Sequence, residues 1–254
     1  MEMHPPKVAA PAAALLPKTA KGWKKRERLR AAARRVFARR GFLEARVSDI
    51  AQEAGVSIGN FYQYFRDKDE MLCELLQEFG EELFKSSRAA GAPGDDPYLA
   101  LEHVTRGLYE VYEKNADLYK VMMQVVQIDP KYTQLWVNMR EPFIQRVYRL
   151  LTHVPEFQRS GINPKYAATA LVNMASQSAY IWIVRRWGLD GETIKLDEAI
   201  ETITRLWYRA MYGTDPVART SKPAVRVGRK KVVGAPVPAS KMVKTPRAGG
   251  RKRK

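Results

Sequence analysis

The chain has few of the residues on which enzymes and metal sites depend. Its 254 residues include one cysteine, Cys73, so no internal disulfide can form, and a single thiol suits a reducing cytoplasm. The histidines, His4, His103 and His153, are too widely scattered to have the spacing of a metal site. The sequence contains no glycine-rich phosphate loop and no nucleophile elbow. We therefore expect a protein that is not an enzyme, with no catalytic residue, metal ion or cofactor.

Long hydrophobic runs are also missing. The longest uninterrupted apolar run, Ala179 to Val184, is far shorter than the roughly 20 residues that a membrane-spanning helix needs. The apolar segment from Val8 to Leu16 is broken by Pro11 and lacks a basic start, so it does not have the pattern of a signal peptide. We expect a cytoplasmic protein with no membrane partner.

Acidic residues are absent from the C-terminal segment, where residues 217–254 contain 13 Lys and Arg. Residues 1–69 contain 15 basic and 7 acidic residues, whereas residues 70–216 contain 16 basic and 20 acidic ones. The three segments therefore carry +8, −4 and +13 of the net charge of +17. Two basic ends around an acidic middle predict a polyanionic partner for the ends, and nucleic acid is the first candidate.

The spacing of the apolar residues predicts an all-α chain with about nine helices between two disordered ends. The leader, residues 1–21, and the tail, residues 214–254, have no periodic apolar face and are rich in Pro, Ala or basic residues. Between them we expect a small basic domain over residues 22–68 and a larger helical domain over residues 69–213. The expected helices cover residues 23–40, 47–54, 57–65, a stretch that begins at about 67, 97–113, 117–127, 130–153 with a kink near Pro142, 164–187 and 197–212.

Two short helices joined by a tight turn stand out in the basic domain. The first ends at Gly55, a residue that permits the turn, and Ser57 is a suitable N-cap for the second. The residues expected to fill the small core between them are Ile50, Val56, Phe61 and Phe65. This pattern is typical of a helix-turn-helix, whose second helix can enter the major groove of DNA.

The run DIAQEAGVS, followed by IGNFYQYFRDK, resembles the signature of TetR/AcrR-type bacterial transcriptional regulators. The resemblance is specific over residues 23–79, whereas the rest of the chain is similar only in its series of helices. The family usually has Thr or Ser as the N-cap of the second helix, and Arg46 stands there instead. Ser48 or Asp49 is expected to cap this helix in its place.

The resemblance implies a homodimeric repressor. Residues 22–68 would bind a palindromic operator in double-stranded DNA, and residues 69–213 would hold a small, apolar effector and the dimer contact. Binding of the effector would shift the fourth helix, change the spacing of the two recognition helices and release the DNA. The protein would then be associated with the nucleoid.

The resemblance also implies which side chains contact DNA. The residues expected at the base edges are Ser48, Ile58, Gly59, Asn60 and Gln63. The residues expected to hold phosphates are Lys24, Lys25, Arg28, Tyr62, Tyr64 and Lys68. Asn and Gln can pair with adenine, Ile can touch a thymine methyl group, and Tyr and Lys are common phosphate contacts. For Tyr62 and Tyr64, packing against the first helix remains an alternative, and the basic residues of that helix can form an ordinary solvated face.

The larger domain is rich in aromatic and methionine side chains, which can line a cavity for an apolar ligand. The candidates for this pocket are Tyr112, Tyr119, Met122, Met123, Trp136, Met139, Phe143, Met174 and Trp182. The candidates for the dimer interface, on the last two long helices, are Ala167, Leu171, Ala175, Ser178, Ile200, Ile203 and Trp207. An ordinary internal core is the alternative for both sets.

One different function stays open at this point. A nucleoid-associated architectural protein would bind DNA through both basic ends without reading an operator. The tail, which ends in Arg251 to Lys254, would add salt-sensitive and sequence-independent affinity in either case. A solvated extension without a dedicated role is the alternative for this tail.

Overall fold

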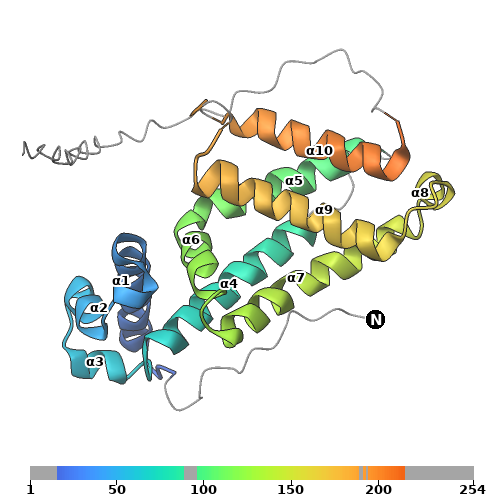
Figure 1. Cartoon of the computed structure of the whole chain (residues 1–254). Coiled ribbons are helices and arrows are strands. Elements are labelled where there is room, and N and C mark those ends of the chain that lie inside the picture. Colours follow the sequence, from blue (N-terminus) through green and yellow to red (C-terminus); the bar gives the residue numbers. More distant parts are fainter. Residues whose placement is uncertain (1–15, 89–95, 189–190, 193, 215–254) are drawn as a thin grey trace, which may run out of the picture. The chain divides into compact units, whose positions relative to one another are not determined.

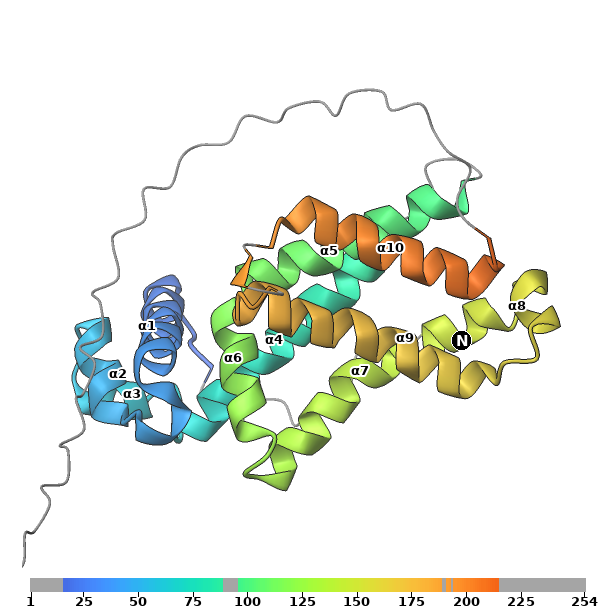
Figure 2. The same ribbon diagram turned by 45° about the horizontal axis from the view of Figure 1, so that its top comes forward.

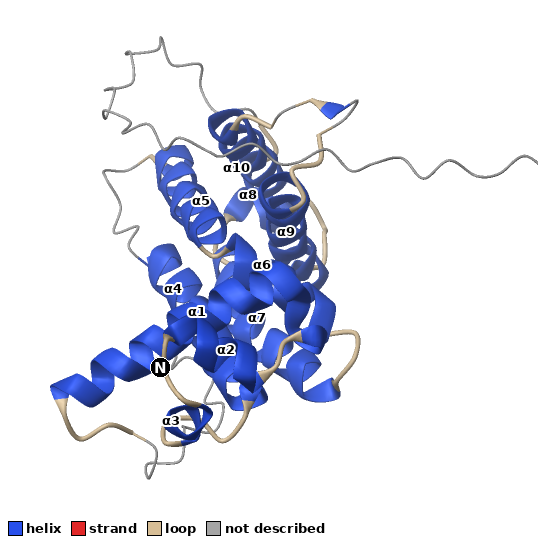
Figure 3. Ribbon diagram, turned by 90° about the vertical axis from the view of Figure 1, so that its left-hand side faces the viewer, coloured by secondary structure: helices blue, strands red, loops and turns tan. Residues whose placement is uncertain are grey.

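The computed structural model describes residues 16–88, 96–188, 191–192 and 194–214. Every regular element in these ranges is a helix, and the described residues contain no strand (Figure 3). The expected all-α fold is therefore confirmed for this part of the chain. Most of the leader and all but the first residue of the basic tail lie outside the described residues.

The first three helices are α1 (Ala20–Glu44), α2 (Val47–Ala54) and α3 (Ile58–Tyr62). α1 begins earlier than expected because Thr19 caps it, with its hydroxyl accepting a hydrogen bond from the Gly22 N–H at 3.1 Å. It continues to Glu44, beyond the expected end at Arg40, across a kink at Gly41, whose φ of 76° lies in the region that favours glycine. α2 has the expected bounds, and α3 ends before the expected Phe65.

α4 (Lys68–Arg88) leads from this group of helices into the larger domain (Figure 1). The Asp67 carboxylate caps it by accepting a hydrogen bond from the Glu70 N–H at 2.7 Å. The Glu70 carboxylate accepts from the Arg66 N–H, also at 2.7 Å, so the two side chains together hold the turn before the helix. The apolar residues on one face of this helix are buried, namely Leu72, Leu75, Leu76, Phe79 and Leu83.

The larger domain continues with α5 (Pro97–Lys114), α6 (Ala116–Val125), α7 (Pro130–Leu151), α8 (Pro155–Arg159), α9 (Pro164–Ala179), the π-helical turn η2 (Tyr180–Val184) and α10 (Leu196–Tyr212). Three of these helices begin with proline after a capping side chain, supplied by Asp96, Asp129 and Asn163. Sequence reasoning missed α8 because five residues are too few to show a helical period. The expected helix over 164–187 is α-helical only to Ala179.

The long helices lie side by side in a bundle (Figures 1 and 2). α4 packs against α5 and α7, α9 packs along α7, and α10 packs along α5. A single hydrophobic core extends from Leu29 in α1 to Ile203 in α10, and a second cluster around Leu151 and Phe157 fills the end near α8. No helix of the described residues has the length and apolarity needed to cross a membrane. The core that extends from Leu29 to Ile203 joins α1 to the larger domain through continuous packing.

Candidate nucleic-acid interface and ligand site

The turn between α2 and α3 has the geometry that a helix-turn-helix requires. Gly55 has a φ of 64°, and its N–H donates to the carbonyls of Ala51 and Gln52, which closes α2. The Ser57 hydroxyl then accepts from the Asn60 N–H at 3.3 Å and starts α3. The apolar residues behind the turn, namely Ile50, Ala51, Phe61 and Phe65, are fully or almost fully buried. The crossing of the two helices is thus fixed by a small core and by two caps.

The N-cap of α2 is supplied from within the helix. Arg46 occupies the cap position, and its side chain makes no capping hydrogen bond. The Asp49 carboxylate accepts a hydrogen bond from the Arg46 N–H at 3.0 Å and also pairs with Arg40 at 3.2 Å. Asp49 therefore stabilises the start of α2 where the sequence lacks the usual Thr or Ser.

The outer face of α2 and α3 leaves most of the candidate base-reading residues accessible. Ser48, Gly59 and Gln63 are exposed, and Ile58 has 48% of its surface exposed. An isoleucine so exposed on a short helix is available for contact with an apolar group outside the chain. Asn60 is half-buried, and its amide donates to the Ser57 hydroxyl at 3.1 Å, so one of its donors also supports the cap.

The two candidate phosphate-binding tyrosines lie in different environments. Tyr62 has 51% of its surface exposed, whereas Tyr64 is half-buried, packs against the core and has its hydroxyl beside Gly22 at the start of α1. Packing against the first helix, the alternative considered above, therefore describes Tyr64 but not Tyr62. Among the basic candidates Lys24 is exposed and Lys25 half-buried. Arg28 donates to the Ala54 carbonyl at 2.7 Å and so holds the end of α2.

Lys68 has a role different from the predicted one. Its ammonium group donates to the carbonyls of Phe42, Leu43 and Ala45, at 2.9, 3.1 and 2.9 Å, and lies 4.7 Å from the centroid of the Phe42 ring. These bonds use all three donor hydrogens of the lysine. The prediction that Lys68 holds a phosphate is therefore corrected: this lysine ties the start of α4 to the end of α1. The sequence could not show that the chain after Gly41 turns its carbonyls toward the lysine.

α1 is attached to α4 by a charged network that the sequence analysis missed. Arg26, only 3% exposed, pairs with Glu74, with one N–H···O distance of 2.6 Å, and its guanidinium lies 4.5 Å from the centroid of the Phe65 ring. One turn further on, Arg30 pairs with Glu74 at 3.2 Å and with Glu78. The matching spacing of four residues on both helices is the signal that could have indicated this pairing.

The described chain resembles proteins of known class. Residues 29–75 match the family model described as bacterial regulatory proteins, tetR family. Over 175 residues the chain is 25% identical to the HTH-type transcriptional repressor KstR2 of Rhodococcus jostii (strain RHA1). This alignment covers 64% of this chain and 78% of the relative. It is 21% identical over 188 residues to the HTH-type transcriptional regulator EthR of Mycolicibacterium smegmatis. This alignment covers 74% of this chain and 86% of the relative.

The fold agrees with this match. A TetR-like transcriptional regulator from Rhodococcus sp. RHA1 superposes with a TM-score of 0.61 at 24% identity, covering 78% of this chain and 100% of that one. A putative TetR-family transcriptional regulator from Syntrophomonas wolfei superposes with a TM-score of 0.60 at 20% identity. This superposition covers 77% of this chain and 99% of that one. Over residues 29–75, and in its fold, this chain is similar to TetR-family regulators. It is a sequence-specific DNA-binding transcriptional regulator, and nothing in these similarities supports the architectural alternative.

The candidate ligand-binding residues form a packed aromatic region. Tyr112 and Tyr119 stack with their centroids 5.0 Å apart, and Tyr119 also contacts Trp136 and Tyr180, with centroids 5.9 and 5.3 Å away. The Tyr119 hydroxyl donates to the Ser176 carbonyl at 2.8 Å. Burial raises the pKa of both Tyr112 and Tyr119, which keeps these phenols neutral.

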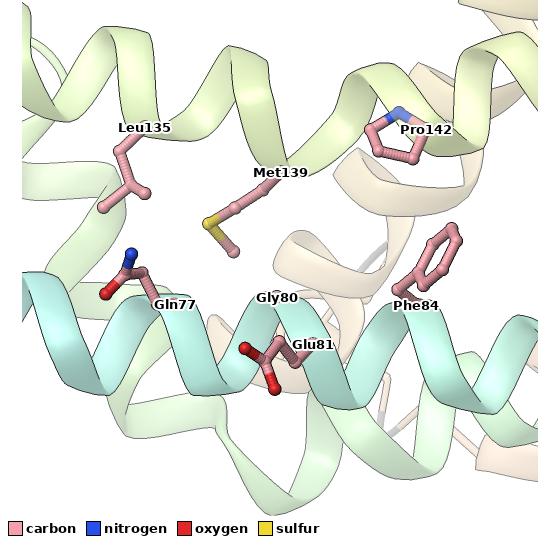
Figure 4. A pocket seen from close by; sticks show the side chains of 7 residues that line it. All are labelled: Gln77, Gly80, Glu81, Phe84, Leu135, Met139 and Pro142. Atoms are coloured by element: carbon pink, nitrogen blue, oxygen red, sulfur yellow. The ribbon is translucent and has the colours of Figure 1, made fainter. Parts of the chain in front are cut away.

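The nine candidates for the pocket divide into two groups by exposure. Tyr112, Tyr119, Met122 and Met139 are buried, and Met123, Trp136, Phe143, Met174 and Trp182 are half-buried. Only Met139 of this set lines the small cavity between α4 and α7, whose volume is about 20 Å³ (Figure 4). The other residues that line it are Gln77, Gly80, Glu81, Phe84, Leu135 and Pro142. This cavity has room for little more than one water molecule.

A second hollow lies on the surface between α4 and α5. It is an open groove of about 570 Å³, and charged side chains such as Glu82, Lys85, Glu110 and Lys114 line it. A charged, open groove does not offer the apolar lining that a hydrophobic ligand needs. The aromatic region around Tyr119 and the small cavity beside Met139 thus remain the candidates for the effector.

Four of the candidates for the dimer interface face the interior of their own protomer. Ile200 and Ile203 are 0% and 1% exposed, and Leu171 and Ala175 are also buried. Their assignment to a dimer contact is corrected, because an apolar periodicity marks the face of a helix that is buried and does not say by what. Ala167, Ser178 and Trp207 are half-buried. The large apolar residues that α9, η2 and α10 leave exposed are Tyr166, Ile181 and Leu206.

Proposed function

We propose that this chain is a homodimeric repressor that binds a palindromic operator through α2 and α3 and is released from it by a small, apolar ligand. The observation that carries this proposal is the exposed face of α3, where Ile58 and Tyr62 stand out of a rigid, capped helix-turn-helix. TetR-family regulators bind DNA, act as dimers and respond to small molecules. The relative KstR2 is itself named as a repressor.

In this proposal the residues of the recognition helix divide by their chemistry. Ser48, Ile58, Gly59, Asn60 and Gln63 contact base edges, with Ile58 against a thymine methyl group and Gln63 paired with adenine. Tyr62, Lys24 and Lys25 contact phosphates, and Arg28 can use its remaining donors in the same way. Lys68 and Tyr64 support the domain from behind.

The dimer contact is assigned to the outer faces of α9, η2 and α10. Tyr166, Ile181 and Leu206 are 77%, 40% and 44% exposed, and three large apolar residues on this face favour contact with a second copy. A twofold axis there would place two recognition helices on the half-sites of a palindrome. This assignment replaces the interior residues that the periodicity suggested.

The release step is assigned to α4. This helix is bonded to α1 through Glu74, Glu78 and Lys68, and it contacts α7 where Gly80 faces Met139. A β-carbon built at Gly80 would come within 2.9 Å of the Met139 side chain, so a ligand that enters between these helices must move one of them. A movement of α4 would carry the recognition helix with it and alter the spacing of the half-sites.

The basic tail is assigned an accessory role. Its 13 positive charges lie outside the described residues and would add salt-sensitive affinity for any DNA. We place the regulator in the cytoplasm, at the chromosome, where its operator lies.

The experiment that tests the proposal is selection of bound sequences from a random DNA pool, with the full chain and with a form that ends after Gly213. Recovery of the same palindrome by both forms is the expected result, and it would leave the tail as an affinity accessory. If neither form enriches any sequence, the chain does not read an operator, and DNA coating by its basic ends becomes the better account.

A further inference from the structure

One arginine in the larger domain reaches into the aromatic region and has no acidic partner among the residues that the structure describes. Arg140, on α7, lies over the Trp136 ring, with the central carbon of its guanidinium 4.8 Å from the ring centroid. It donates a hydrogen bond to the Asn173 side-chain oxygen on α9. Its Nε is buried and has no hydrogen-bond partner among the described residues. The guanidinium is therefore only partly satisfied within the described part of the chain.

The electrostatic setting of Arg140 is unusual for this protein. Burial lowers the pKa of Arg140, and the groups that oppose this change are the phenols of Tyr112 and Tyr119, which are themselves neutral. Arg26 and Arg34, by contrast, each pair with a carboxylate, from Glu74 and Asp117. A buried charge without a partner costs free energy, and a bound ion of opposite sign removes that cost. The guanidinium thus has the features of a site for an anion that the described residues do not supply.

The neighbouring side chains fit a ligand that is anionic at one end and apolar elsewhere. Asn173 accepts from Arg140 through its oxygen, which leaves its NH₂ group as a donor. Burial raises the pKa of Tyr112, so its hydroxyl stays protonated and can donate a hydrogen bond. Around these polar groups lie the rings of Tyr119 and Trp136 and the side chain of Met174. Arg140, Asn173 and Trp136 are each partly exposed, and they lie on α7 and α9, which pack against each other.

We propose that Arg140 binds the carboxylate of the effector, and that the effector is an apolar monocarboxylate whose body lies among the aromatic side chains of α5, α6, α7 and η2. This inference rests on the proposed ligand-controlled release from DNA and names the chemical class of that ligand. The planar guanidinium can donate two parallel hydrogen bonds to one carboxylate, using Nε and a terminal nitrogen. The Asn173 amide and the Tyr112 hydroxyl supply further donors to the same group.

The test uses the full chain with two readouts, the Tm and the tryptophan fluorescence. The probes are hexanoate, decanoate, palmitate and phenylbutyrate, each compared with the primary alcohol that has the same carbon skeleton. At least one acid should raise the Tm of the wild type and bind more tightly than its alcohol. Arg140→Met should weaken the binding of that acid by roughly tenfold or more, because the charged hydrogen bonds are lost, and leave the alcohol unaffected.

Two further variants keep the test interpretable. Arg140→Lys keeps the charge but not the planar fork, so it should bind the acid with intermediate affinity, and it serves if Arg140→Met does not fold. Arg159→Met removes an exposed arginine from α8 and should leave acid binding unchanged. The assignment is overturned if no acid binds the wild type better than its alcohol, or if Arg140→Met binds the acid as well as the wild type does.

The two proposals fail in different ways. The selected operator is titrated with each protein in the presence and absence of the acid. If the acid binds through Arg140 without releasing DNA, the carboxylate site stands and the proposed release is wrong. If the acid releases the Arg140→Met variant from the operator as readily as it releases the wild type, the regulator responds to the ligand but the assignment of Arg140 is wrong.

Discussion

Arg26 and Arg140 both place a guanidinium inside the protein, but the two regions satisfy these groups differently. In the DNA-binding region Arg26 pairs with Glu74 and lies against the Phe65 ring, so its charge is balanced within the chain. In the aromatic region of the larger domain Arg140 has Trp136 and Asn173 as its contacts and no carboxylate among the described residues. A balanced buried charge fixes one geometry, whereas an unbalanced one is suited to a ligand. Arg26 thus stabilises the DNA-binding region, whereas Arg140 is the group that we propose to bind the effector.

The largest expected effect comes from removing each arginine in turn. Arg26→Met leaves the mostly buried Glu74 with a weaker partner and should lower the free energy of unfolding by about 3 kcal/mol. Arg140→Met removes a charge without an acidic partner, so the stability should stay the same or rise. Denaturant unfolding of both variants measures this difference. Equal losses from the two substitutions would show that Arg140 is as much a structural group as Arg26.

The second prediction compares two apolar residues of α10. Ile203 is 1% exposed, so Ile203→Ala should lower the free energy of unfolding by about 3 kcal/mol through the cavity that it leaves. Leu206 is 44% exposed, so Leu206→Arg should leave folding almost unchanged but shift the protein from dimer to monomer. Unfolding curves and light scattering separate the two outcomes. A dimer that survives Leu206→Arg would place the contact elsewhere.

The third prediction concerns Lys68, which replaces a predicted DNA contact with a structural one. Lys68→Met removes the ammonium that binds three carbonyls and should cost about 2 kcal/mol of stability. The slope of operator affinity against salt concentration should not change, since no phosphate contact is lost. Lys24→Met is the control, because this exposed lysine is proposed to hold a phosphate and its loss should reduce that slope. A reduced slope for Lys68→Met would restore the original prediction.

The smallest expected effect distinguishes the two tyrosines of the recognition region. Tyr62→Phe should weaken operator binding by about 1 kcal/mol, because one hydrogen bond to phosphate is lost. Tyr64→Phe should leave the affinity almost unchanged, since its ring packs behind the helix and its hydroxyl lies beside Gly22. Fluorescence anisotropy with a labelled operator measures both. Equal losses would mean that both tyrosines face the DNA.

The fold and the helix-turn-helix could be predicted from the sequence because their signals are local. Gly55 and Ser57 mark the turn by backbone conformation and capping, and the bounds of α2 follow directly from them. The apolar residues of α4 recur every three or four positions, and this spacing likewise predicts which face is buried. Such features depend on neighbours three or four positions away, which the sequence displays.

Long-range contacts explain what the sequence could not predict. Lys68 bonds to carbonyls more than twenty positions away, and Ile203 is buried by helices that the sequence does not place beside it. The most buried apolar residues of α9 and α10 face the interior of the protomer, whereas Leu206 lies on the exposed side of α10. The spacing of the apolar residues predicts that these faces are buried, but it does not show which other helices bury them.

Base-by-base binding measurements test whether α3 reads the DNA sequence. The selected operator and its single-base variants are titrated with the wild type and with Ile58→Ala. The account predicts that the wild type discriminates among these sequences and that Ile58→Ala loses discrimination at one symmetry-related pair of positions, where a thymine methyl group is read. Equal affinity of the wild type for every sequence, or a uniform loss across all of them in the variant, would contradict the account.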